Sequence, residues 1–177
     1  MDEHRQNIFS LASYLLHYPE EELLEGKEIM EYIEQVPNRK IRRCFYDFFQ
    51  EIKKMNYQEL TTHYVTTFDF NEKTTLYLTY RIFGDNRERG AALIKLKFEY
   101  AKADLVVLDD ELPDYLPLIL EFASIAEEAS VKKIFAIHRK AMDELHEALI
   151  ELKSPYRKIL EACQIAITQI LANTKAS

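Results

Sequence analysis

Apolar residues recur at helical spacing through the first third of the chain. The apolar positions within residues 8–16 fall on one helix face, and Pro19 ends that segment. A second apolar segment covers residues 23–33 and is stopped by Pro37. A third covers residues 41–52 and has a strongly aromatic face. The pattern therefore predicts three helices before residue 53.

The next region admits two interpretations. YVTTFDF (64–70) and TLYLTYRIF (75–83) are rich in β-branched and aromatic residues and partly alternate, which is typical of a hairpin across NEKT (71–74). A helical interpretation also fits, with Thr74 or Thr75 capping the second segment. The residues that would share the first helix face are Leu60, Tyr64, Val65 and Phe68. Periodicity alone leaves both open.

The pattern becomes helical again in the second half of the chain. It predicts a helix over residues 86–103, a loop over 105–110, and helices over about 115–128 and 131–152. Ser154 and Pro155 are the expected N-cap and first residue of a last helix.

The stretch DDELPDYLPLILEFAS (109–124) marks the start of one of these helices. Proline is tolerated only in the first turn, and with Asp114 as the N-cap, Pro117 takes the third helical position. The acids around it would lie at the positive end of the helix dipole.

The composition supports this helical reading. Three glycines and five prolines in 177 residues are too few for the frequent turns of a sheet protein. The length suits one domain. The sequence therefore predicts an all-α, single-domain bundle of about seven to nine helices over residues 1–177, with 171–177 as a fraying tail.

Charge and targeting signals narrow the function. A net charge of −7 and a pI near 5.3 argue against a nucleic-acid binder and permit a basic partner. The N-terminus MDEHRQNIF has no signal-peptide order, and no apolar run reaches the ~20 residues that span a bilayer, so we expect a cytoplasmic protein. Cys44 and Cys163 lie in helical patterns and are expected to be buried free thiols.

The sequence shows no catalytic or metal-binding motif. Its five histidines are scattered, and His138 and His146, two turns apart on one predicted helix, are expected to be surface residues. Nucleophile-elbow, Walker A and dinucleotide-binding patterns are absent. We therefore predict no metal site, no catalytic residue and no enzyme. The basic NRKIRR (38–43) reads as a solvated first turn, with a specific anion site as the alternative.

One charged region is unusual. Residues 103–131 contain eight acids and no lysine or arginine. They form either a solvated acidic loop or a negative rim beside apolar groups, suited to an amphipathic basic peptide. The eight acids are Asp104, Asp109, Asp110, Glu111, Asp114, Glu121, Glu127 and Glu128.

Three blocks carry a family resemblance. Residues 64–70 (YVTTFDF), 76–93 (LYLTYRIFGDNRERGAAL) and 111–122 (ELPDYLPLILEF) resemble the signature blocks of the NarJ-type nitrate reductase assembly chaperones. That family, also called the nitrate reductase delta subunit or molybdenum cofactor assembly chaperone, lies within the TorD-like redox-enzyme maturation proteins. The resemblance covers roughly residues 5–155.

The resemblance implies an all-α fold and a client. The client would be the apo catalytic (alpha) subunit of respiratory nitrate reductase, bound chiefly through its leader-like N-terminal segment. The chaperone would hold the client until molybdenum guanine dinucleotide is inserted, and would bind no cofactor stably itself. A permanent structural subunit of the reductase is the alternative, and an enzyme or carrier acting on the cofactor would require a basic pocket.

The same blocks supply the candidate client-binding residues. Tyr115 stands where TorD-like relatives have histidine, as is usual in the NarJ branch. The tyrosines and Phe68 would offer apolar groove contacts or pack in the core, and the two arginines would pair with acids to brace the loop or touch the client. The predicted set is Asp109, Asp110, Glu111, Asp114, Tyr115, Glu121, Tyr64, Phe68, Tyr77, Tyr80, Arg87 and Arg89.

Overall fold

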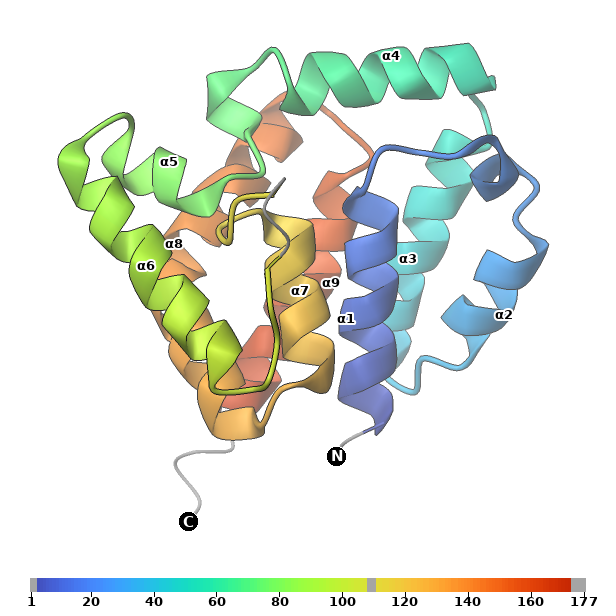
Figure 1. The fold of residues 1–177 in the computed structure, drawn as a ribbon. Coiled ribbons are helices and arrows are strands. Elements are labelled where there is room, and N and C mark those ends of the chain that lie inside the picture. Colours follow the sequence, from blue (N-terminus) through green and yellow to red (C-terminus); the bar gives the residue numbers. More distant parts are fainter. Residues whose placement is uncertain (1–2, 108–110, 173–177) are drawn as a thin grey trace.

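The computed structural model describes residues 3–107 and 111–172. Within them the chain forms nine α-helices and two short 3₁₀ helices, which confirms the predicted all-α fold (Figure 1). In chain order the elements are α1 (Glu3–Leu16), η1 (Glu21–Leu24), α2 (Lys27–Glu34), α3 (Arg39–Ile52), α4 (Tyr57–Phe68), η2 (Glu72–Thr74), α5 (Leu78–Phe83), α6 (Arg87–Ala101), α7 (Leu116–Ile125), α8 (Glu128–Glu151) and α9 (Arg157–Ala172).

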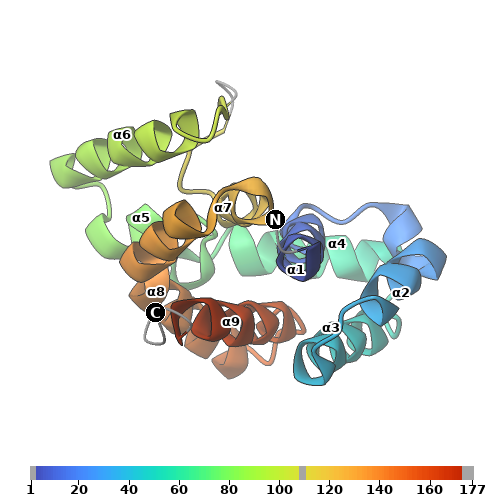
Figure 2. The same ribbon diagram turned by 90° about the horizontal axis from the view of Figure 1, so that it is seen from below.

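The centre of the bundle is formed by α1, α7 and α9. Helix α1 packs against α7 and α9, and α9 also packs against α3 and α8. The predicted apolar face of α1 is buried here, with Ala12 and Leu16 fully inaccessible to solvent. Figure 2 shows α6 and the pair α2 and α3 on opposite sides of this centre. The two sides therefore present separate surfaces.

The predicted second helix is two elements. Residues 21–24 form η1 and α2 begins at Lys27, because Gly26 between them has a left-handed backbone with φ of 73°. A side chain at position 26 would also overlap the ring of Phe49, which is buried on α3. Glycine therefore permits both the turn and the close approach of α2 to α3.

The ambiguous region 64–83 is helical. Helix α4 begins with a capping box, in which the Asn56 side chain accepts from the Glu59 backbone N–H (2.9 Å) and the Glu59 carboxylate accepts from the Asn56 N–H (2.8 Å). Helix α5 ends at Phe83 and is followed by Gly84, which has a positive φ of 56°. The hairpin interpretation is wrong because these end signals, and tertiary packing, favour helices.

The starts of α5 and α7 are held together by backbone. The Leu78 N–H donates to the Asp114 carbonyl (3.0 Å), and the Leu116 N–H donates to the Leu76 carbonyl (2.8 Å). These bonds form an isolated antiparallel bridge between Tyr77 and Tyr115. Two of the blocks that carry the family resemblance therefore meet at this point.

Several predicted helix ends shift. The N-cap of α7 is Tyr115, without a side-chain cap, so the prediction of Asp114 was wrong and Pro117 is the second helical residue. Helix α9 begins at Arg157 and continues to Ala172, so it includes the first two residues of the predicted tail 171–177. The rest of that tail lies outside the described residues.

Two further predictions concern the cysteines and membrane-spanning segments. Both Cys44 and Cys163 are buried and free, as predicted. Among the described residues, no helix has the length and apolar character needed to cross a membrane.

Candidate functional site

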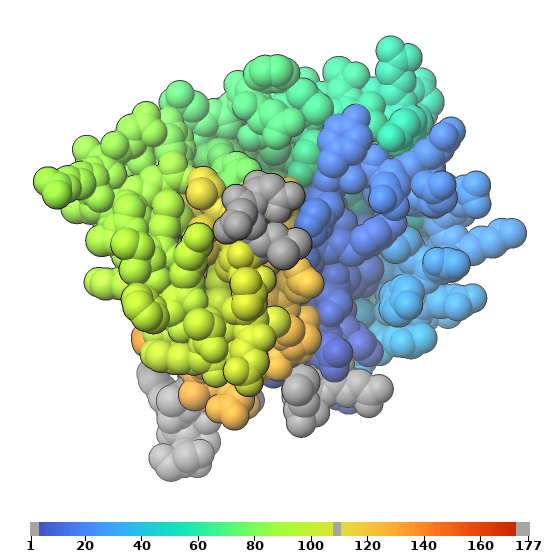
Figure 3. All heavy atoms as spheres, viewed as in Figure 1, coloured from blue at the N-terminus to red at the C-terminus, as the bar shows by residue number. Residues whose placement is uncertain are grey.

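A groove with a volume of about 510 Å³ opens between the end of α1, the segment that follows α6, and α7. Figure 3 shows the face on which this segment lies between α6 and α1. We call this cavity the acid-rimmed groove. It is lined by His17, Tyr18, Tyr100, Leu105, Val106, Val107, Glu111, Tyr115, Leu118, Glu121, Phe122 and Ile125.

Apolar side chains form most of the groove. Tyr100 and Phe122 pack against each other at its base, with ring centroids 4.8 Å apart. Val106 and Ile125 stand at its margin, and the Val106 residue is 88% exposed. Exposed apolar groups next to a concave apolar surface are typical of a binding site.

The charges around the groove have one sign. Glu111 and Glu121 line it, and the described lining residues include no lysine or arginine. The Glu111 Oε1 atom accepts from the Tyr77 hydroxyl (3.0 Å) and from the Leu112 N–H (2.9 Å). A carboxylate can accept further hydrogen bonds, so Glu111 is oriented by these bonds and still able to receive a cation.

Tyrosine hydroxyl groups hold the wall of the groove in place. The Tyr64 hydroxyl donates to the Leu16 carbonyl (2.9 Å) and lies 3.3 Å from the Tyr115 hydroxyl. Burial raises the pKa of Tyr64, and burial followed by the bond to Glu111 raises the pKa of Tyr77. The hydroxyls of Tyr64 and Tyr77 therefore stay protonated near neutral pH and act as neutral hydrogen-bond donors.

Asp114 lies behind the groove rather than in it. Its residue is 0% exposed, and its Oδ2 atom accepts from the Thr79 N–H (3.1 Å), from the Thr79 hydroxyl (2.5 Å) and from Arg89 Nη2 (3.4 Å). Asp114 therefore caps α5 and is neutralised by Arg89, which corrects the prediction that it caps α7 and presents its charge. Arg89 also stacks over the Tyr80 ring at 5.3 Å.

The predicted residues divide into distinct groups. Glu111, Tyr115 and Glu121 line the groove. Tyr64 and Phe68 belong to the core, where both rings pack edge-on against Tyr156.

The remaining predicted residues lie elsewhere. Tyr77 is half-buried beside Glu111. The expected bracing role fits Arg89 only, because Arg87 is exposed and no hydrogen bond or ion pair joins its side chain to another described residue. Asp109 and Asp110 lie outside the described residues.

Sequence reasoning missed several lining residues. His17 and Tyr18 follow α1, and 105–107 follow α6, so neither stretch shows a periodic signal. Tyr18 is 52% exposed and precedes Pro19, where the helical pattern has ended, so no sequence signal places it in the groove.

His138 is buried on α8, so the prediction of a surface histidine was wrong. Neither ring nitrogen has a hydrogen-bond partner in the described part of the chain, and burial lowers the pKa to about 4, with Asp114 opposing that change. His138 is therefore neutral at pH 7. Across residues 3–107 and 111–172, no group of three or more His, Cys, Asp or Glu could hold a metal ion.

These features define an all-α protein with a groove of the size and charge that suit a basic peptide. The chain belongs to the nitrate reductase delta subunit family, which it matches over residues 29–161. This match confirms the resemblance of the three sequence blocks.

Similar proteins carry related names. The chain is 38% identical over 94% of its length to the "Probable nitrate reductase molybdenum cofactor assembly chaperone NarJ" of Bacillus subtilis, and the match covers 91% of that protein. It is 30% identical to the "Nitrate reductase molybdenum cofactor assembly chaperone NarJ" of Escherichia coli over 63% of this chain and 49% of that one. It is also 30% identical to the "Nitrate reductase-like protein NarX" of Mycobacterium tuberculosis, over 88% of this chain and 23% of that one.

Proposed function

We propose that this chain is an assembly chaperone for nitrate reductase and that its acid-rimmed groove receives the N-terminal segment of the reductase catalytic subunit. Family membership and the names of the relatives support the chaperone role. The observation that carries the binding site is the combination of an apolar base with Glu111 and Glu121, without a cation among the described lining residues.

An amphipathic basic peptide would use the groove in two ways. Its apolar side chains would pack on Leu118, Phe122 and Ile125, and each fully buried one contributes about 1.5–3 kcal/mol. Its lysines or arginines would face Glu111 and Glu121, where exposed ion pairs contribute up to about 1 kcal/mol each. The apolar contacts therefore supply most of the affinity, and the acids set the charge preference and speed the encounter.

In this proposal the chain acts in the cytoplasm and catalyses no reaction. It holds the catalytic subunit while molybdenum guanine dinucleotide is inserted into that subunit, and it binds no cofactor stably itself. The proposal makes the chain a transient partner that leaves before the reductase is complete. A permanent structural subunit would instead remain with the mature enzyme.

Calorimetric titration tests the binding site. The ligand is a synthetic peptide of the first ~15 residues of the nitrate reductase catalytic subunit. We expect micromolar affinity at low salt, with a loss of about tenfold in the double variant Glu111→Gln with Glu121→Gln. Raising the salt concentration should weaken the wild-type complex more than the variant complex.

A matched control removes the same charge elsewhere. The exposed acids Glu147 and Glu151 lie on α8, away from the groove, so Glu147→Gln with Glu151→Gln should leave the affinity within twofold. Equal losses in both double variants would assign the effect to net charge and reject the groove. Absence of binding, together with co-purification of the chain with the mature membrane enzyme, would favour the structural-subunit alternative.

A further inference from the structure

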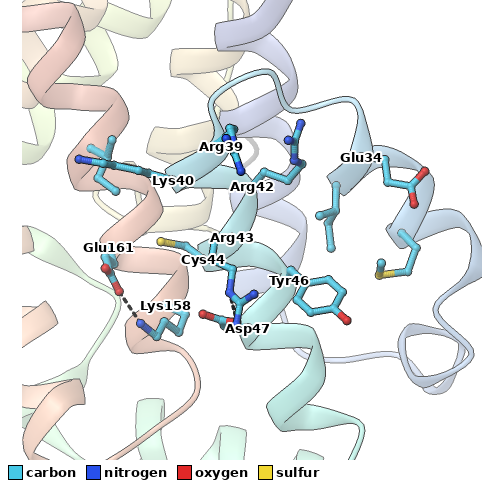
Figure 4. A pocket seen from close by; sticks show the side chains of 13 residues that line it. Glu34, Arg39, Lys40, Arg42, Arg43, Cys44, Tyr46, Asp47, Lys158 and Glu161 are labelled. Carbon is cyan, nitrogen blue, oxygen red and sulfur yellow. Dashed lines mark hydrogen bonds and ion pairs between the residues drawn. The ribbon is translucent and has the colours of Figure 1, made fainter.

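A second cavity, of about 710 Å³, lies between α2, α3 and α9 (Figure 4). Its elements are different from those that form the acid-rimmed groove. We call it the basic pocket. It is lined by Met30, Ile33, Glu34, Arg39, Lys40, Arg42, Arg43, Cys44, Tyr46, Asp47, Lys158, Glu161 and Ile165.

Two of the five cations in the pocket are neutralised internally. Arg43 Nε lies 2.7 Å from the Asp47 carboxylate, and Lys158 Nζ lies 2.8 Å from the Glu161 carboxylate. Within each of these two ion pairs the positive and the negative charge cancel. They leave three cations and one acid, Glu34, to face solvent.

The three remaining cations are available to a ligand. Arg39 and Lys40 are exposed, and no other described residue forms a hydrogen bond or ion pair with either side chain. Arg42 donates one bond, from Nη1 to the Val36 carbonyl (3.0 Å), and keeps its other donors. Since Glu34 is the one acid of the described lining without an ion-pair partner, the three free cations give the pocket a net positive charge.

The positive charges of Arg39 and Lys40 do not stabilise the fold. Arg39 and Lys40 occupy the first turn of α3, where the helix dipole disfavours positive charge. The Asn38 side chain already caps that turn, accepting from the Lys40 N–H (2.9 Å) and the Ile41 N–H (3.2 Å). A local choice that opposes helix stability without a compensating contact is typical of a functional site.

The floor of the pocket is apolar. It consists of the buried or half-buried residues Met30, Ile33, Cys44 and Ile165, and the exposed Tyr46 ring lies at its margin. Burial raises the pKa of Cys44 to about 11, so this residue stays a neutral thiol and adds no negative charge. The pocket therefore combines an apolar floor with a positive rim.

We propose that the basic pocket binds an acidic, partly apolar peptide segment of a partner protein. The carboxylates of that segment pair with Arg39, Lys40 and Arg42, and its apolar side chains pack on the floor. This site has the opposite charge preference to the acid-rimmed groove and does not depend on the function proposed for the groove.

The arrangement of charge favours spaced carboxylates over a compact polyphosphate. Figure 4 shows the charged side chains spread across the pocket, with Lys40 toward α9 and Glu34 on α2. Glu34 is set apart from the cations on α2, and Asn38 occupies the Lys40 and Ile41 amides that would otherwise help to cradle a phosphate. A peptide can place its acids between these charges.

Fluorescence anisotropy with the full chain tests the proposal. The probe is a fluorescein-labelled synthetic peptide of about 12 residues, with four glutamates spaced by two leucines and neutral residues. We expect saturable binding that falls at least tenfold in the double variant Arg39→Glu with Lys40→Glu. A probe with serine in place of both leucines should also bind at least fivefold more weakly.

The matched control is Lys54→Glu with Lys97→Glu, which makes the same charge change at exposed positions outside the pocket. It should retain wild-type affinity for the probe, and circular dichroism should show that both double variants are folded. Titration with the basic leader peptide should be unchanged in Arg39→Glu with Lys40→Glu, which separates this proposal from that for the groove.

Four results of the binding experiments would overturn the proposal. They are the absence of saturable binding, an equal loss in the control variant, full affinity for the serine probe, and displacement of the probe by pyrophosphate at lower concentration than by unlabelled peptide. The last would reassign the pocket to phosphate ligands. A separate sedimentation experiment tests for self-association: if the chain self-associates and Arg39→Glu with Lys40→Glu abolishes this, the occupant is a second copy of the chain and the proposal is also overturned.

Discussion

The charges behind the acid-rimmed groove and the charges of the basic pocket differ in how they are held. Behind the groove, Asp114 and Arg89 come from distant parts of the sequence and neutralise each other in the interior. In the pocket, Arg39 and Lys40 are neighbours in sequence and stand in solvent at the start of α3.

This contrast separates structural charge from charge that can meet a ligand. A buried, paired carboxylate stabilises the contact between two helices and is not accessible to a binding partner. An exposed group without a partner contributes little to folding and keeps its full charge for binding. Glu111 combines features of both, because Tyr77 orients it while it remains accessible.

Removing the buried carboxylate should have the largest effect. Asp114→Ala leaves Arg89 without its ion-pair partner and the Thr79 N–H without an acceptor, so we expect a loss of about 3–5 kcal/mol in the free energy of unfolding. Urea denaturation followed by circular dichroism measures this loss. The control Glu88→Ala, at an exposed site on α6, should change stability by less than about 0.5 kcal/mol. A similar small change for Asp114→Ala would contradict the structural role of this charge.

Acid should lower the free energy of unfolding through the protonation of His138, which is buried on α8. Its pKa is about 4 in the folded protein and near 6.5 when unfolded, so the unfolded state binds the proton first as pH falls. The contribution of His138 to the free energy of unfolding is therefore fully present above pH 6.5. It is lost as the pH falls toward 4, and the loss amounts to about 3 kcal/mol.

The variant His138→Leu isolates that contribution. It removes two unpaired ring nitrogens and the titration, so its stability should depend less on pH than that of the wild type. Urea denaturation at pH 7.0, 5.5 and 4.5 gives the comparison. Parallel pH profiles for the two proteins would show that His138 does not titrate as described.

A smaller effect is expected at the groove wall. Tyr64→Phe removes the hydroxyl that donates to the Leu16 carbonyl and should cost about 1–2 kcal/mol. The exposed Tyr32→Phe on α2 is the matched control and should be neutral. Equal unfolding free energies for Tyr64→Phe and the wild type would mean that the bond adds nothing to stability.

The charges of the basic pocket should have the smallest effect on stability, with the opposite sign. Arg39→Glu with Lys40→Glu replaces unfavourable cations by favourable acids in the first turn of α3, so we expect a gain of about 1 kcal/mol at low salt. The gain should shrink in 1 M NaCl, where charges on the surface are screened. A destabilised variant would show that these cations support the fold, and the argument for their role in binding would fail.

The sequence predicted the long helices because their apolar periodicity is itself the packing surface. The segments 8–16 and 41–52 are the buried faces of α1 and α3. The start of α4 is also visible in the sequence, because Asn56 and Glu59, three residues apart, have the spacing of a capping box.

The candidate site was predicted only in part, for a physical reason. Local rules place Asp114 at the nearest helix start, whereas its carboxylate binds Thr79, which lies 35 residues earlier in the chain. Contacts at that separation depend on how the helices pack, and no single-sequence pattern encodes them. The same limit hid His17 and Tyr18, which join the groove only because α1 packs against α7.

The location of leader binding is the central claim, and amide chemical-shift mapping tests it most directly. The ¹⁵N-labelled chain would be titrated with the peptide from the N-terminus of the catalytic subunit. We predict the largest shifts at His17, Glu111, Tyr115 and Glu121, and no shifts at Arg39 and its neighbours in α3. Shifts concentrated on α3, with the groove unchanged, would contradict the account.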